Sequence, residues 1–347
     1  MKYLPVSTDS LAEAAQVIRL GGLVAFPTET VYGLGADAYN PAALVKIFEA
    51  KGRPRFDPLI IHIAAAGALE EAANLSLLSA EARRKLFLLA ESLWPGPISI
   101  ILPKSDKIPG IATAGLSTAA IRLPANEAAR SLISLSGTAI AAPSANPFGS
   151  LSPTRAEHVR KGLGDKVDII LDGGPAQIGL ESTVLDLTEK FIKILRPGGT
   201  PKEAIENLIG PVESGSPVIE DMAAANAGNS HSGFSSPGQL KSHYSPKTPL
   251  SAFSAREISG LPCEKNAAFL FFDDSSLALW QNTRTEAAEN PVVKVLSPSG
   301  RLSEAASCLF EALHELDSSG VSRIFAQFAP EEGLGAAIND RLKRACA

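Results

Sequence analysis

Three cations lie within one short loop: Lys51, Arg53 and Arg55, with Pro54 and Pro58 interspersed. An arginine fork binds a phosphate group through two hydrogen bonds, and a lysine adds a compact positive charge. A basic loop that prolines stiffen is therefore a candidate clamp for a polyphosphate. A solvated basic turn is the alternative interpretation, and three isolated cations on their own favour it.

Two further arginines favour the interpretation as a phosphate-binding site over that of a solvated turn. Arg122 and Arg196 each end an apolar run and stand next to or near a proline, where a purely structural arginine is less expected. Ser144, Asn146 and Ser152 offer hydroxyl and amide groups beside prolines, which suit phosphate or ribose oxygens. The polar residues thus collect at expected strand ends and loops, where a scaffold displays reactive groups.

His62 and a pair of glycines give weaker signals. His62 stands in an otherwise apolar strand, and taken alone it is better interpreted as a hydrogen-bonded core histidine. Gly33 and Gly35 lack the third glycine of a dinucleotide fingerprint, and the sequence has no phosphate loop of the G-x-x-x-x-G-K-[ST] type. It also has no G-x-S-x-G nucleophile elbow. Any nucleotide must therefore be held in another way.

The elements that must position these groups alternate between helix and strand. Apolar spacing and capping residues predict helices over 8–20, 41–50 and 79–93. Short apolar runs predict strands over 23–26, 59–63, 98–102, 119–123, 139–142, 167–171, 182–187 and 192–195. Short strands interleaved with helices indicate an α/β domain with a mixed sheet.

The amino-acid composition changes near residue 210 and again near residue 249, so the chain is expected to consist of three parts. Residues 1–210 form the first domain, and residues 211–249 are rich in small polar residues, which is typical of a flexible linker. Residues 250–347 return to strand–helix alternation, with strands expected over 267–272, 292–296 and 321–325 and helices over 302–316 and 335–344. This spacing predicts a small parallel, Rossmann-like sheet.

Composition narrows the class of protein. The net charge is −5, yet residues 1–210 carry balanced charges, so the acidic excess lies in the remainder. This distribution suits a small anionic substrate better than a long polyanion. The sequence has neither an apolar run of the ~20 residues that span a bilayer nor a secretory signal, so we expect a cytoplasmic protein. Three scattered cysteines support neither a disulfide framework nor a zinc site.

Seven motifs occur in order between residues 10 and 205: PTETVYGLGAD, KGRPRFDPLIIH, LWPGP, IRLP, APSAN, ESTV and LRPGG. In this order and spacing they resemble the YrdC-type domain of the threonylcarbamoyl-AMP synthases. Residues 237–249, PGQLKSHYSPKTP, resemble the linker motif of the long, two-domain form of that family. The C-terminal region is similar to that form in length and pattern.

The resemblance implies a fold and a reaction. The fold would be a YrdC-like twisted mixed sheet with helices, followed by a smaller Rossmann-like parallel-sheet domain. L-Threonine would take up bicarbonate, and the resulting carbamate would attack the α-phosphate of ATP and release pyrophosphate. The threonylcarbamoyl-AMP would pass to a downstream threonylcarbamoyl transferase complex, which modifies adenosine in tRNAs that read codons beginning with A. The resemblance requires neither stable tRNA binding nor a membrane.

The family's functional residues map onto this sequence position by position. The implied threonine pocket consists of Thr30, His62, Arg122, the backbone of Ala142, and Ser182. The implied ATP site consists of Arg53, Asp57, Thr118, Ser144, Asn146, Ser152, Arg196 and Tyr244, with Tyr244 closing from the linker as a lid. Lys51, Arg53, Arg55 and Arg122 would carry the catalytic charge stabilisation. Mg²⁺ would arrive with ATP, ligated by phosphates and water and by no protein side chain.

Two other functions are possible for such a chain. Similar domains occur in hydrogenase-maturation proteins, which implies a carbamoyltransferase that uses carbamoyl phosphate. Those proteins carry cysteine clusters and acylphosphatase modules, and this sequence has neither. An RNA-binding module is the second alternative, because tRNA lies downstream. The acidic total and the absence of an aromatic and basic surface motif argue against it.

Overall fold

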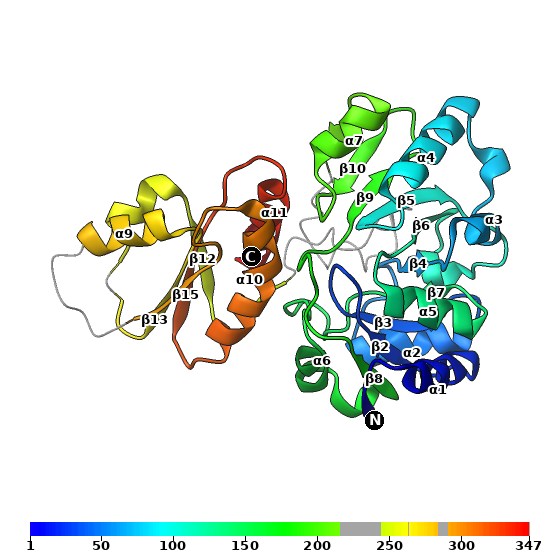
Figure 1. The fold of residues 1–347 in the computed structure, drawn as a ribbon, viewed down its shortest axis with the longest axis horizontal. Helices are drawn as coiled ribbons and strands as arrows, with labels where there is room; N and C mark the ends of the chain where they lie inside the picture. Colours follow the sequence, from blue (N-terminus) through cyan, green and yellow to red (C-terminus); the bar gives the residue numbers. More distant parts are fainter. Residues whose placement is uncertain (216–243, 263, 284–290, 347) are drawn as a thin grey trace. The chain divides into compact units, whose positions relative to one another are not determined.

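The computed structural model describes residues 1–215, 244–262, 264–283 and 291–346, which form two compact units (Figure 1). Unit 1 contains residues 1–148, 152–177 and 181–215. Unit 2 contains residues 149–151 and 178–180 together with the described residues from Tyr244 onward. Residues 216–243, which include most of the predicted linker and the start of the linker motif, lie outside the described residues. Each unit is considered by itself below.

Unit 1 is built on a mixed sheet of eleven strands. They are β1 (Lys2–Pro5), β2 (Val24–Phe26), β3 (Gly33–Asp37), β4 (Ile60–His62), β5 (Ile98–Pro103), β6 (Thr118–Arg122), β7 (Ile140–Ala141), β8 (Ile169–Asp172), β9 (Thr183–Asp186), β10 (Lys193–Arg196) and β11 (Glu213–Ser214). Their order in the sheet is β1-β8-β2-β3-β7-β4-β6-β5-β9-β10-β11. The pairs β4·β6 and β5·β9 are parallel, whereas β5·β6 and β4·β7 are antiparallel. The predicted α/β class with a mixed sheet is confirmed.

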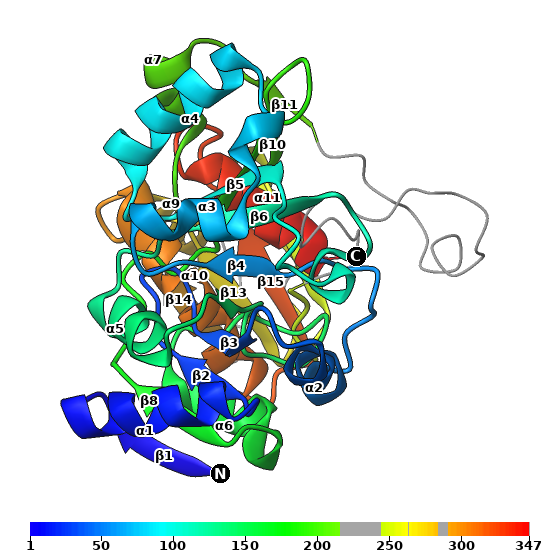
Figure 2. The same ribbon diagram turned by 90° about the vertical axis from the view of Figure 1, so that its right-hand side faces the viewer.

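Seven α-helices accompany the sheet in the described part of unit 1 (Figure 2). They are α1 (Thr8–Arg19), α2 (Pro41–Lys51), α3 (Leu69–Ala72), α4 (Ala80–Leu93), α5 (Glu127–Ser136), α6 (Ala156–Gly162) and α7 (Lys202–Ile209). Helix α2 shows why these residues form a helix: Asn40 caps the first amides, Pro41 stands at the first turn, and Gly52 ends the helix in the left-handed conformation. The helices predicted over 8–20, 41–50 and 79–93 are confirmed. Helices α3, α5, α6 and α7 were not among the predictions.

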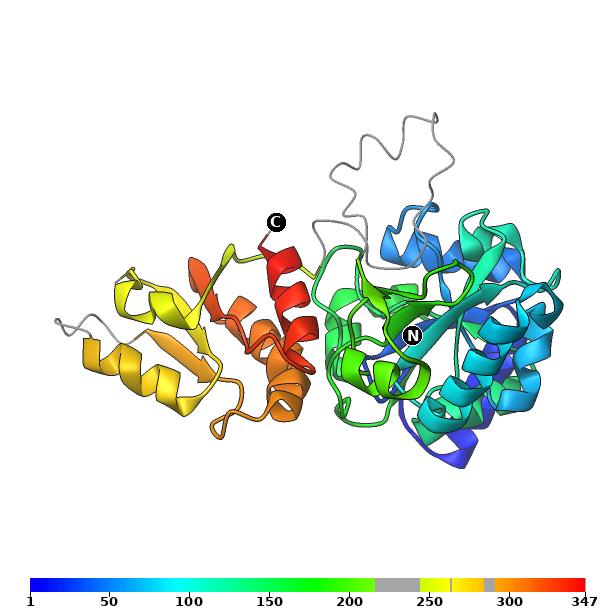
Figure 3. The same ribbon diagram turned by 90° about the horizontal axis from the view of Figure 1, so that it is seen from above.

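Alternation along the strands builds two layers of core. Val24 and Phe26 of β2 join the cluster that α1 and α5 cover, whereas Ala25 between them joins the cluster on the opposite face. That second cluster also receives the apolar stripes of α2, α4 and α7. The helices therefore lie on both faces of the sheet (Figures 2 and 3), as mixed α/β folds require.

Gly33 and Gly35, which lack the third glycine of a dinucleotide fingerprint, lie in strand β3. A Cβ on Gly35 would lie 2.7 Å from Ile140 Cγ2 and 2.8 Å from Phe26 Cε1, which is too close for any side chain. The glycines therefore admit the ring of Phe26, which pairs across the sheet with Gly33. Their role here is packing in a central strand.

Unit 2 is a small sheet of four parallel strands, β12 (Leu250–Phe253), β13 (Ala267–Phe271), β14 (Val292–Val295) and β15 (Arg323–Gln327), in the order β12-β15-β13-β14. Helices α9 (Asp274–Thr283), α10 (Leu302–Asp317) and α11 (Gly335–Ala345) accompany it. Phe269, Phe271, Trp280 and Phe325 form its aromatic core. The predicted Rossmann-like parallel sheet is confirmed, although β12 and α9 were not expected. None of the described helices in either unit is long and apolar enough to cross a membrane.

Candidate functional site

The candidate site begins on one face of the middle strands of unit 1. On this face Ile60, Ala120, Ile101, Val184 and Leu195 form a small apolar cluster, separate from the two main cores. Because side chains alternate along a strand, the residues two positions away from these apolar residues share their face. On β4, β5 and β6 those residues are polar: His62, Ser99 and Arg122.

His62 and Arg122 are direct partners in the parallel ladder between β4 and β6. Both side chains are buried, each with 3% of its surface exposed. The Nδ1 atom of His62 lies 3.2 Å from the carbonyl oxygen of Ile60. A carbonyl only accepts, so Nδ1 carries the proton and Nε2 is the acceptor in the neutral ring. The edge of Phe26 also packs against the ring.

His62 is neutral at physiological pH. Burial, the largest cause, and the positive charge of Arg122 together lower its pKa from 6.5 to about 3, against the raising effects of Glu29 and of backbone hydrogen bonds. The neutral imidazole therefore offers one hydrogen-bond acceptor to a ligand, and it is unsuited to carry positive charge.

Arg122 forms a buried ion pair that the sequence did not reveal. Its Nη2 donates to Oε1 of Glu29 at 2.7 Å, and its Nε donates to the carbonyl oxygen of Gly96 at 3.3 Å. The pKa of Glu29 is lowered: burial opposes this shift, and the charge and hydrogen bond of Arg122 outweigh it. Glu29 lies next to Thr30 in the PTET motif, and this position was the signal in the sequence that could have identified it as a site residue.

The remaining residues of the predicted threonine pocket are also buried. Thr30 Oγ1 lies 2.8 Å from Thr28 Oγ1, which itself donates to the Val31 carbonyl and so shapes the loop between β2 and β3. Ser182 Oγ lies 2.8 Å from Ser99 Oγ. The amide of Ala142 donates to the Ile60 carbonyl within the sheet. Ser99 was not predicted, because a serine inside an apolar strand carries no motif.

Arg196, predicted to bind the nucleotide, is hydrogen-bonded to Ser182, which was predicted to line the threonine pocket. Its Nη2 donates to the carbonyl oxygen of Ser182 at 2.9 Å and to the Ser182 hydroxyl at 3.2 Å. Gly198 allows this approach, since a Cβ there would lie 2.3 Å from the Glu181 carbonyl oxygen. The ESTV and LRPGG motifs thus meet at one place.

The predicted basic loop is divided into buried and exposed cations. Lys51 is the last residue of α2 and is buried, and its ammonium donates to the carbonyl oxygens of Ser144 and Asn146. Burial lowers the pKa of Lys51 well below its usual value, and the nearby charge of Arg53 adds to this effect. Only Arg55 is exposed, so the picture of three cations projecting from a solvated turn is wrong for Lys51 and Arg53.

Asp57 lies at the centre of a group of cations. Its Oδ1 is 2.9 Å from Nη2 of Arg53, yet neither carboxylate oxygen has a hydrogen bond within the described chain. Burial raises the pKa of Asp57, and the charges of Arg53, Lys51 and Arg196 each act to lower it. The two guanidinium charges of Arg53 and Arg196 exceed the single carboxylate charge that Asp57 can carry, so the cluster suits a polyanion.

The other predicted nucleotide residues are distributed more widely. Ser152 is fully buried and donates to Oε1 of Glu181, and the Asn146 amide donates to the Pro147 carbonyl at 3.0 Å. Thr118 begins β6, at the opposite end of the strand from Arg122. Tyr244 belongs to unit 2.

Within unit 2 the Tyr244 ring has well-defined neighbours. It packs against Phe310, with ring centroids 5.7 Å apart, and Arg341 stacks over it at 5.0 Å. Its φ of 64° is unusual for a residue with a side chain. Tyr244 thus lies among residues of unit 2, and its role in closure stays a prediction.

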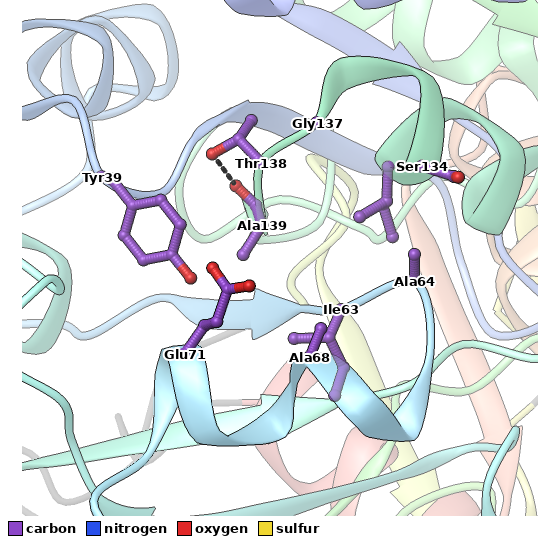
Figure 4. A pocket seen from close by; sticks show the side chains of 10 residues that line it. Tyr39, Ile63, Ala64, Ala68, Glu71, Ser134, Gly137, Thr138 and Ala139 are labelled. Atoms are coloured by element: carbon purple, nitrogen blue, oxygen red, sulfur yellow. Dashed lines mark hydrogen bonds between the residues drawn. The ribbon is translucent and has the colours of Figure 1, made fainter.

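A separate pocket in unit 1 contains none of the predicted residues. It lies between the segment after β4, the end of α5 and the start of β7, and Tyr39, Glu71 and Thr138 supply its polar groups (Figure 4). Among the described residues, no group of three or more His, Cys, Asp and Glu side chains could hold a metal ion.

Two family models together match nearly the whole chain. Residues 16–198 match the Sua5, YciO and YrdC family, which carries the description telomere recombination. Residues 200–347 match the threonylcarbamoyl-AMP synthase C-terminal domain.

Full-length relatives agree with these matches. The threonylcarbamoyl-AMP synthase of Pyrococcus abyssi is 41% identical over 96% of this chain and 92% of its own length. That of Bacillus subtilis is 40% identical over 99% of this chain and 94% of its own length. The crystal structure of P. abyssi Sua5 complexed with L-threonine superposes with a TM-score of 0.84 at 38% identity, covering 99% of this chain and 96% of that chain.

Proposed function

This chain belongs to the threonylcarbamoyl-AMP synthase family, and from that premise we propose how unit 1 joins L-threonine, bicarbonate and ATP into L-threonylcarbamoyladenylate. It is an enzyme of the nucleotidyltransferase type, and L-threonine is its substrate. The product serves the threonylcarbamoylation of adenosine in tRNAs that read codons beginning with A. The amine condenses with bicarbonate to a carbamate with loss of water. An oxygen of the carbamate then attacks the α-phosphorus of ATP, and pyrophosphate leaves.

Threonine binds on the face that carries His62, Arg122 and Ser182. The guanidinium of Arg122 pairs with the threonine carboxylate, since a planar fork matches that group. Neutral His62 accepts a hydrogen bond from the threonine hydroxyl or amine, and Thr30 and Ser182 supply further hydroxyls. What supports this assignment is that the pocket already contains one buried cation, one buried anion and a neutral imidazole.

ATP binds against the cations that surround Asp57. Displacement at phosphorus needs positioning and charge neutralisation more than covalent chemistry, so the protein contributes mainly a fixed positive field. Arg53 and Arg196 supply that field from buried positions, and exposed Arg55 reaches the triphosphate from the loop. Lys51 contributes charge and holds the segment of Ser144 and Asn146 in place.

The donor set fits an Mg²⁺ ion that arrives with ATP. Asp57 is a buried carboxylate of the proposed ATP site, and the charges of three cations act on it, which disfavours binding of a further cation there. Phosphate oxygens and water are then the ligands, as Mg²⁺ accepts readily. The ion would neutralise charge on the triphosphate during displacement.

One observation carries the proposal: Arg196 is bonded to Ser182, so the threonine face and the cation cluster form one continuous site. Incubating the protein with ATP, L-threonine and bicarbonate should yield the adenylate by mass spectrometry and stoichiometric pyrophosphate. Omitting either threonine or bicarbonate should abolish both. Pyrophosphate release that does not depend on threonine would contradict the proposal. A carbamoyl-phosphate-dependent product would support the carbamoyltransferase alternative instead.

Two steps around the reaction complete the proposal. Carbamates decompose in water, so the site must close during turnover, and Tyr244 is the residue we propose for that closure. A downstream threonylcarbamoyl transferase complex then consumes the adenylate. Replacing Tyr244 by alanine should lower turnover while the fold of unit 1 is retained.

A further inference from the structure

Among the described residues, the guanidinium of Arg122 uses one of its edges. Nε donates to the Gly96 carbonyl at 3.3 Å, and Nη2 donates to Glu29 at 2.7 Å. A guanidinium has five N–H donors in a rigid fork, so both donors on Nη1 and one on Nη2 remain. In the described part of the chain Nη1 donates to no group. The remaining donors lie together at the end of the guanidinium, where a carboxylate can accept two parallel hydrogen bonds.

Glu29 is fixed independently of Arg122. Its Oε2 accepts from the backbone amide of Asn126 at 3.4 Å, and Asn126 is the N-cap of α5. The side chain is 3% exposed. The side chain of Glu29 therefore connects the loop after β2 to the start of α5. A group held at both oxygens is a rigid support for the side chain that it binds.

We propose that Glu29 is a positioning residue that presents the free edge of Arg122 to the carboxylate of the amino-acid substrate. This inference rests on the proposed threonine pocket, and it assigns Glu29 a role through Arg122 with no contact to the substrate. Two supports, Glu29 on Nη2 and the Gly96 carbonyl on Nε, fix the plane of the guanidinium. Glu29 also neutralises the buried charge before substrate arrives, so the site stays assembled.

A double-mutant cycle with Glu29→Gln and Arg122→Lys tests this role. A neutral amide holds the guanidinium less firmly than a carboxylate, so we expect Glu29→Gln to raise the threonine KM about tenfold. The ATP KM should stay within about twofold and kcat within about threefold. Lysine has no fork to orient, so Glu29→Gln in the Arg122→Lys background should change the threonine KM less than about threefold. Glu81→Gln, in an exposed ion pair with Lys85, is the matched control and should change neither KM.

The outcomes separate this inference from the proposed function. An equal effect of Glu29→Gln in both backgrounds, or none in either, overturns the positioning role while the threonine pocket stands. An Arg122→Lys enzyme with an unchanged threonine KM shows that the pocket itself is misplaced. Thermal unfolding of each variant establishes that it folds. Should Glu29→Gln not fold, Glu29→Asp moves the carboxylate by one methylene and should raise the threonine KM likewise; an unchanged KM there overturns the inference.

Discussion

Arg196 donates to Ser182 twice from the same nitrogen, at 2.9 Å to the carbonyl oxygen and at 3.2 Å to the hydroxyl. The Ser182 hydroxyl in turn lies 2.8 Å from the hydroxyl of Ser99, on the face of the proposed threonine pocket. The charge of Arg196 also acts on Asp57 in the cation cluster. One guanidinium therefore connects the two proposed subsites, and its removal should weaken the binding of both substrates.

Arg196→Lys should raise the KM for threonine and the KM for ATP, each by about tenfold. Lysine keeps the charge but cannot donate from a planar fork to Ser182, and hydrogen bonds to charged groups are worth about 1.5–3 kcal/mol. Initial rates with each substrate varied in turn give both values. Lys193→Ala, on the same strand but half exposed and paired with Glu213, is the control and should leave both constants within about twofold. A change in the KM for ATP alone would show that Arg196 does not connect the two proposed subsites.

Lys51→Met should raise the ATP KM about tenfold or more with little change in the threonine KM. The carbonyl oxygens of Ser144 and Asn146 lose their buried donor, and each unpaired buried group costs about 1–3 kcal/mol. The segment that they belong to then leaves its position beside the nucleotide. Steady-state kinetics and thermal unfolding measure the two effects.

Lys46→Met provides the control for that experiment. Lys46 lies on the same helix and donates to the carbonyl oxygen of Gly21 at 2.6 Å, away from the predicted nucleotide residues. It should lower the unfolding temperature without changing the ATP KM. If both variants raise the ATP KM equally, the effect of Lys51 is a general consequence of lost stability.

The elements of unit 1 that sequence predicted best are those with a local cause. Helix α2 has its cap at Asn40, its first-turn proline at Pro41 and its terminal glycine at Gly52, so all of its signals lie within one short stretch of sequence. Strand β3 was missed because its glycines are explained by Phe26, which lies on a different strand. Helices α6 and α7 are short and begin without a side-chain cap, so sequence offered little to mark them.

The same distinction holds in the candidate site. Arg122 and Arg196 stood out because each ends an apolar run, which is a local signal. The partner that each one uses, Glu29 or Ser182, comes from another motif, and no spacing in the sequence connects them. Nor does sequence distinguish buried Lys51 and Arg53 from exposed Arg55, because burial depends on what folds over the loop.

The buried ring of His62 should make the stability of the protein depend on pH. Its pKa is about 3 in the folded state and 6.5 in the unfolded state, so below pH 6.5 the unfolded chain binds a proton that the folded protein does not. The free energy of unfolding therefore falls as pH drops from 6.5 towards 3, by at most about 1.4 kcal/mol per pH unit. Denaturant unfolding between pH 6.5 and pH 5 measures this slope while most carboxylates remain ionised.

His62→Gln should flatten that dependence, since glutamine does not titrate. A slope that survives in His62→Gln would assign the proton uptake to another group.

A substitution at Arg55 distinguishes an effect on ATP binding from an effect on stability, because Arg55 is the exposed cation of the basic loop. Arg55→Ala should leave the free energy of unfolding within about 0.5 kcal/mol, as surface substitutions usually do. It should nevertheless raise the ATP KM several-fold at low ionic strength. The effect should shrink in high salt, since exposed charges are screened over about 10 Å at 0.1 M. Arg84→Ala, at an exposed arginine of α4, should change neither quantity. An Arg55→Ala enzyme with an unchanged ATP KM at low salt would mean that the triphosphate lies beyond the reach of this loop and depends on the buried cations alone.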